Sequence, residues 1–167
     1  MPDAVVDTGP LIHLDEIRQL KLLLDIFETL HIPEAVLEEL TNTEAKAFIN
    51  SHLNTRIKTT NIPDQHIFAA KDRYAGFRLQ FADLSILAQM QHISEAVGVT
   101  DDLTLRKAIE QSGRTVTGTV GILFRACKLQ IISTDHLRDA VNRLFDDSSL
   151  YLSSAFKTRI VEMIESV

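Results

Sequence analysis

The chain alternates between short strand-like and longer helix-like patterns, and this alternation limits its fold more than any other feature. Apolar runs that are typical of strands lie at residues 4–7, 29–32, 56–61, 96–100 and 114–117. Helical patterns lie at 11–24 (as two short helices), 33–40, 44–53, 64–74, 81–93, 103–111, 118–128 and, beyond 133, in two further segments that end near 146 and 165. Strands that alternate with helices predict an α/β fold, with a parallel sheet covered on both faces.

The first apolar run ends in an acid, Asp7, and Pro10 then suits the first turn of a following helix. Ligands of open parallel sheets bind at the carboxyl ends of strands, beside the point where the strand order reverses. An Asp that caps its own turn is the ordinary explanation for such a residue. A role for Asp7 in chemistry therefore depends on other acids reaching the same edge of the sheet.

Four further acids are expected near that edge. Glu39 lies in the helix after the second strand-like run, and Asp83 lies in the first turn of the helix at 81–93. Asp101 and Asp102 directly follow the fourth run. In right-handed crossovers each helix begins near the carboxyl end of the preceding strand. If the fourth run pairs with the first, all these acids face one edge.

Grouped carboxylates raise one another's pKa and cost stability unless a cation compensates their charge. A cluster of hard oxygen ligands without His or Cys is what Mg²⁺ or Mn²⁺ selects. Such ions generate hydroxide from bound water and stabilise the transition state of phosphodiester hydrolysis. Each acid also has a local explanation, because carboxylates suit helix starts and solvated helix faces.

Composition excludes several other classes of protein. At 167 residues and 45% hydrophobic content, the chain suits one domain with a sizeable core. Its formal net charge of −6 argues against binding nucleic acid through a basic surface, unless cations neutralise an acidic pocket. The single Cys127 excludes an internal disulfide and a Cys-based zinc site. The six histidines lack metal-ligand spacing, and we expect them at the surface or in an interface.

We expect a cytoplasmic protein without a membrane segment, because no apolar run approaches membrane-spanning length and the N-terminus lacks a signal-type core. Four basic residues near the acids in sequence are candidates for phosphate contacts, although a solvated helix face is the simpler explanation for each. They are Arg73, Arg78, Arg106 and Lys107.

Four segments resemble, in order and spacing, the four acidic motifs of PIN-domain nucleases: residues 5–12, 33–40, 82–88 and 99–102. Residues 116–123 and the helical C-terminal extension are similar to a prokaryotic PIN subgroup. The resemblance implies a three-layer α/β/α fold with a central parallel sheet, metal-dependent cleavage of single-stranded or structured RNA, and frequent homodimerisation. Toxin members of the family, of the VapC type, pair with an antitoxin.

Carried over to this sequence, the resemblance implies a catalytic and metal-binding quartet of Asp7, Glu39, Asp83 and Asp102. Asp7 and Asp102 would be the main ligands of Mg²⁺ or Mn²⁺, and the other two would complete the site or orient the water. The subgroup often carries a Gly-Glu sequence before its third motif, whereas this chain has Phe81-Ala82-Asp83 there. At this motif the chain therefore resembles the wider nuclease family more than the subgroup.

Two positions leave a choice between neighbouring acids. Glu39 is preferred to Glu38 because it directly precedes Leu40, as in the family's Glu-Leu pattern. Asp102 is preferred to Asp101 because the family usually places this acid two residues after a Thr, although Asp101 stays an alternative metal ligand. Thr8 resembles the hydroxyl that often follows the family's first acid, which implies that it bonds a ligand or a metal-bound water.

The sequence predicts a PIN core at residues 1–132 and a C-terminal extension at 133–167 that packs on the core or on a dimer partner. One helical stripe of the extension is expected to be buried; it comprises Leu137, Ala140, Val141, Leu144 and Phe145. The alternative function is a PIN-like module that binds RNA or a protein without catalysis. An aspartic protease is excluded because that class is all-β. A receiver domain is disfavoured because it needs a Lys at the end of a late strand, and Lys128 lies within a helical pattern instead.

Overall fold

A computed structural model describes all of residues 1–167 and contains one parallel sheet of five strands. The strands are β1 (Ala4–Val6), β2 (Leu30–Pro33), β3 (Ile57–Thr60), β4 (Val97–Val99) and β5 (Val116–Thr117). Their order across the sheet is β3-β2-β1-β4-β5. Each strand lies within a segment that the sequence predicts to be extended, apart from the one-residue continuation of β2 to Pro33.

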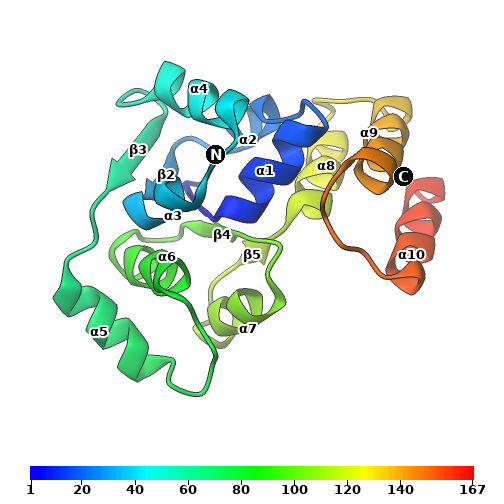
Figure 1. The fold of residues 1–167 in the computed structure, drawn as a ribbon. Helices are drawn as coiled ribbons and strands as arrows, with labels where there is room; N and C mark the ends of the chain where they lie inside the picture. The colour runs from blue at the N-terminus through cyan, green and yellow to red at the C-terminus, as the bar shows by residue number, and fades with distance from the viewer.

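The chain forms ten helices, most of which surround the sheet (Figure 1). They are α1 (Thr8–Glu16), α2 (Lys21–Ile26), α3 (Glu34–Glu39), α4 (Thr43–His52), α5 (Asp64–Arg73), α6 (Phe81–His92), α7 (Leu103–Gln111), α8 (Thr119–Lys128), α9 (Thr134–Asp147) and α10 (Ser154–Glu165). In Figure 1, α1, α2, α4 and α8 lie on one side of the sheet, and α5, α6 and α7 lie on the other. The result is a three-layer α/β/α fold, as predicted.

The strand order reverses between β1 and β4, because the chain proceeds from β1 through β2 to β3 on one side and from β4 to β5 on the other. In this pairing Val6 lies opposite Val99, and the N–H of Asp7 donates to the carbonyl of Val99 at 2.9 Å. The three residues of β1 are fully buried. The central pair of strands therefore places the residues that follow Val6 and Val99 side by side at the carboxyl edge.

Helix α6 is buried on nearly all sides, with Ala82 and all of residues 84–90 in the core. It packs on β1 and β2 and also contacts α3 and α5, so that a second layer covers the face that points away from the sheet. Gln91 is exposed near its C-terminal end. This double coverage explains why its apolar residues are not confined to one stripe.

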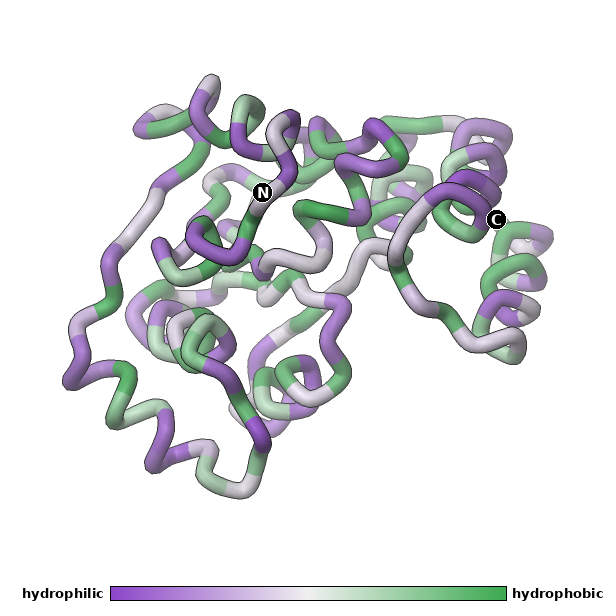
Figure 2. The backbone as a smooth tube through the Cα atoms, viewed as in Figure 1, coloured by the Kyte–Doolittle hydropathy of each residue, from purple (hydrophilic) through white to green (hydrophobic).

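The C-terminal extension packs on the rest of the chain. Helix α9 contacts α1 and α8, and α10 contacts α9. Four members of the predicted stripe (Leu137, Ala140, Val141 and Leu144) are fully buried, and Phe145 is partly buried. Hydrophilic and hydrophobic residues alternate along α9 and α10 in Figure 2, as expected for helices with one buried face. No helix has the length and apolar character needed to cross a membrane.

Replacing Leu144 by alanine should lower the free energy of unfolding by about 2–5 kcal/mol, because it leaves a cavity beneath α9. Urea denaturation measures this loss, and Asn142→Ala, at an exposed position of the same helix, is the matched control. A loss for Leu144→Ala no larger than that for the control would show that α9 does not pack on the core in solution.

Candidate active site

Asp7 lies at the centre of the candidate site, between the end of β1 and the start of α1, and is 8% exposed. Its Oδ1 accepts the N–H of Thr8 at 2.8 Å, and its Oδ2 accepts the hydroxyl of Thr100 at 2.7 Å. Burial raises the pKa of Asp7, both hydrogen bonds lower it and the charges of Asp83 and Asp102 add to the rise, so that the pKa reaches about 6.

Asp102 caps the N-terminus of α7, where its Oδ1 accepts the N–H of Leu105 at 2.7 Å. Its own N–H donates to Oγ1 of Thr100 at 3.1 Å. The same Thr100 hydroxyl donates to Asp7, so one buried side chain joins the two acids across the β1–β4 boundary.

Asp83 reaches the site from the first turn of α6. Its Oδ2 accepts the N–H of Gln80 at 2.8 Å in a capping box, and the side chain of Gln80 accepts the N–H of Asp83 in return. Burial raises the pKa of Asp83 above its ordinary value, the hydrogen bond to Gln80 opposes this, and the charges of Asp102 and Glu39 add to the rise. Asp83 is therefore electrostatically coupled to the other acids of the quartet.

Glu39, the last residue of α3, joins the group at its exposed side. Its Oε2 accepts the hydroxyl of Thr8 at 3.2 Å. The neighbouring Glu38 is also exposed but lines a separate pocket of about 290 Å³ with Glu34 and Phe81. The structure thus places Glu39, and not Glu38, against the residue that follows Asp7.

The structure does not bring Asp101 into this group. Its Oδ1 accepts the N–H of Thr119 at 2.7 Å, and its Oδ2 accepts the hydroxyl of Thr119 at 2.6 Å and Nδ1 of His13 at 2.7 Å. Burial would raise the pKa of Asp101, but these hydrogen bonds hold it below its ordinary value. A Cβ on Gly118 would lie 2.6 Å from Oδ1 of Asp101, so this contact requires glycine. Asp101 links α1 to the start of α8.

The expectation that the histidines lie at the surface or in an interface is wrong for two of them. His13 is largely buried against Asp101, and His31 is 9% exposed with its Nε2 2.9 Å from Asp3. No spacing in the sequence marks these two histidines as buried, because each is covered by a carboxylate from a distant segment.

The donor set of the quartet fits a hard divalent cation, because it offers carboxylate oxygens without His or Cys. Three of these carboxylates use one oxygen in the hydrogen bonds described above and keep the other without a partner: Glu39, Asp83 and Asp102. No three acidic, His or Cys side chains lie close enough together to hold an ion as they stand. Like-charge repulsion opposes a closer approach until a cation compensates it.

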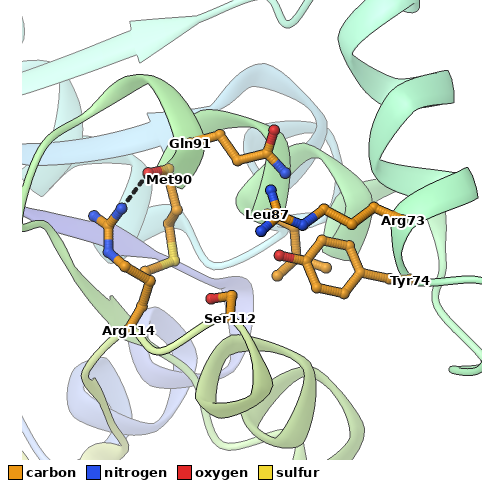
Figure 3. Close-up of a pocket in the computed structure, with 7 residues that line it drawn as sticks. All are labelled: Arg73, Tyr74, Leu87, Met90, Gln91, Ser112 and Arg114. Carbon is orange, nitrogen blue, oxygen red and sulfur yellow. Dashed lines mark hydrogen bonds between the residues drawn. The ribbon is translucent and has the colours of Figure 1, made fainter.

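A pocket of about 330 Å³ lies at the opposite edge of the sheet, where α6 and α7 end (Figure 3). Arg114 donates there to the carbonyls of Met90, Ile93 and Ala96. Arg114 thus satisfies carbonyls at and after the C-terminal end of α6, where the helix dipole also favours a cation. Arg73, a candidate for phosphate contacts because it is close to Asp83 in sequence, lines the same pocket. It therefore lies away from the carboxylates of the candidate active site.

A family model described as a PIN domain matches residues 3–166 of the chain. The chain therefore belongs to the PIN-domain family, and the C-terminal extension falls within the matched region. Its fold is that of a family of nucleases, which generally use divalent metal ions. No curated protein matches the chain.

The raised pKa of Asp7 predicts that its ionisation destabilises the protein in the absence of metal ions. The folded state holds the proton more tightly than the unfolded state, so stability falls as the pH rises from about 4 to about 7. A displacement of the pKa from 3.8 to about 6 corresponds to about 3 kcal/mol at most. Asp7→Asn should remove this loss and make the chelated protein more stable than wild type at pH 7.5.

Urea denaturation across this pH range, in the presence of a chelator, measures the difference. Asp146→Asn, at an exposed position of α9, should leave the pH profile unchanged. Parallel profiles for wild type and Asp7→Asn would contradict the burial of an ionisable Asp7.

Proposed function

We propose that this protein is a metal-dependent endoribonuclease that hydrolyses RNA phosphodiester bonds with Mg²⁺ or Mn²⁺. The observation that carries the proposal is the convergence of Asp7, Glu39, Asp83 and Asp102 at the carboxyl edge of β1 and β4. Four carboxylates in electrostatic contact would be a costly arrangement if they served only as helix caps. Membership of the PIN-domain family supports the same chemistry.

In this proposal Asp7 and Asp102 are the main metal ligands, and Asp83 and Glu39 complete the site or orient the attacking water. A bound divalent ion would supply a Lewis acid for the phosphate and lower the pKa of that water. The protein's own contribution is orientation. Thr100 fixes Asp7 and Asp102 relative to each other, and Thr8 holds Glu39 at their exposed side.

The VapC-type toxin role, an antitoxin partner and a homodimer remain proposals that rest on the family resemblance. A cytoplasmic location is a further proposal, which the single free Cys127 supports. The alternative proposal of a binding module without catalysis is separated from the nuclease by the cleavage experiment that follows.

Cleavage of a labelled pool of single-stranded RNA should require Mg²⁺ or Mn²⁺ and stop with excess chelator. Asp7→Asn and Asp102→Asn keep the shape of the side chain but remove its charge, and each should lower the rate by more than about 100-fold. Glu39→Gln should also lower the rate, whereas Glu38→Gln is the matched control and should cleave like wild type.

Cleavage that survives chelation, or that both Asn variants retain in full, would rule out the proposed mechanism. Metal-independent binding of the RNA without cleavage by any preparation would favour the binding module.

Mn²⁺ should also raise the melting temperature, because an ion that binds only the folded state stabilises it by mass action. The shift should be largely lost in Asp7→Asn and kept in Glu38→Gln, as scanning calorimetry can measure. An equal shift in wild type and Asp7→Asn would place the bound ion elsewhere.

A further inference from the structure

A groove of about 580 Å³ lies beside the carboxylates, between the core and the C-terminal extension. One wall comes from α7, β5 and α8, and the other from residues 150–163. Asp101 and Leu103, the two chain neighbours of Asp102, both line it. We call this cavity the C-terminal groove. It adjoins the candidate active site through these chain neighbours of Asp102, and most of its lining residues are hydrophobic.

The wall that the C-terminal extension contributes is held in place by specific contacts. The carboxylate of Glu16 accepts both the N–H and the hydroxyl of Ser149, which ties the segment before α10 to α1. Ile160 of α10 is fully buried, and Nζ of Lys157 lies 5.3 Å from the centre of the Phe145 ring. The groove is therefore a preformed feature of the fold.

The lining of the groove combines aromatic rings with a single cation. Phe124, Tyr151 and Phe156 contribute the rings, and Tyr151 is 88% and Phe156 42% exposed. Arg106 contributes the cation, one helical turn after Asp102, whose carbonyl accepts the N–H of Arg106 at 3.0 Å. Its Nη2 is 3.4 Å from the carbonyl of Thr100, so the guanidinium is near the catalytic edge and keeps donors free.

We propose that the C-terminal groove binds an unpaired nucleobase of a single-stranded RNA substrate, next to the phosphate that a divalent ion at Asp7 and Asp102 would hold. Tyr151 and Phe156 provide surfaces for stacking, and Arg106 contacts a neighbouring phosphate. The inference rests on the proposed function and adds the residues that bind a nucleotide beside the cleaved phosphate. A nucleic acid fits better than a peptide because Arg106 places a cation one helical turn after Asp102, beside aromatic rings on which bases stack.

The binding test uses the full chain carrying Asp7→Asn, so that the RNA stays intact, and a fluorescein-labelled hexamer of uridine in the presence of Mg²⁺. In this background, Tyr151→Leu with Phe156→Leu keeps the groove apolar but removes two rings, and the dissociation constant should rise at least about 5-fold. The matched control is Phe68→Leu, which replaces an exposed ring on α5 outside the groove and should leave affinity unchanged.

A hexamer without bases provides a second arm of the test. It should bind the Asp7→Asn parent at least about 5-fold more weakly than the uridine hexamer, and it should bind the leucine variant and its parent equally. Arg106→Gln should reduce the slope of the logarithm of affinity against the logarithm of salt concentration by about 1. Melting curves of each variant verify that the fold is retained.

Equal affinity of the parent and the leucine variant for the uridine hexamer would overturn the proposal and leave the groove to a protein ligand. Absence of hexamer binding to the parent would overturn it as well. Because metal-dependent cleavage by wild type is measured separately, a nuclease whose groove variants bind RNA normally would refute the groove and leave the proposed function intact.

Discussion

The parallel pairing of β1 with β4 is the constraint on which the candidate site depends. It sets Val6 opposite Val99, so the residues that follow these two strands leave the sheet at the same point. The hydroxyl of Thr100 then donates to Asp7 and accepts from the N–H of Asp102. The register of the two strands therefore places two acidic residues, Asp7 and Asp102, next to each other.

This placement has an energetic cost that the rest of the structure offsets. Asp7 is buried among apolar strands, and its pKa of about 6 reflects mainly that loss of solvation. The N-termini of α1 and α7, at Thr8 and Leu103, carry partial positive charge next to Asp7 and Asp102. These helix dipoles partly compensate the negative charge of the two carboxylates. The arrangement is consistent with a site that gives up stability for charge density, as functional sites commonly do.

Much of the fold could be predicted from the sequence, because local patterns determine it. Apolar runs and helix starts located all five strands, and the strand–helix alternation required a parallel sheet. The sequence placed Asp7 and Asp102 at one edge only on the condition that the fourth strand pairs with the first, and the structure has this pairing.

Contacts between segments that are distant in sequence were not predictable in the same way. No local pattern predicts that Asp101 forms hydrogen bonds with His13 and Thr119. Nor does one predict that Arg73 lies at the opposite edge of the sheet. The choice between Glu38 and Glu39 likewise depends on how α3 meets Thr8, which is a property of packing. The C-terminal groove depends on residues 150–163 lying opposite α7, β5 and α8.

Anomalous diffraction from crystals grown with Mn²⁺ tests most directly whether Asp7 and Asp102 hold the metal ion. We expect a manganese peak bounded by carboxylate oxygens of Asp7 and Asp102, with Asp83 or Glu39 directly bound or one water away. A peak coordinated by Asp101 in place of Asp102 would contradict it, as would a fully occupied site elsewhere and none at this edge.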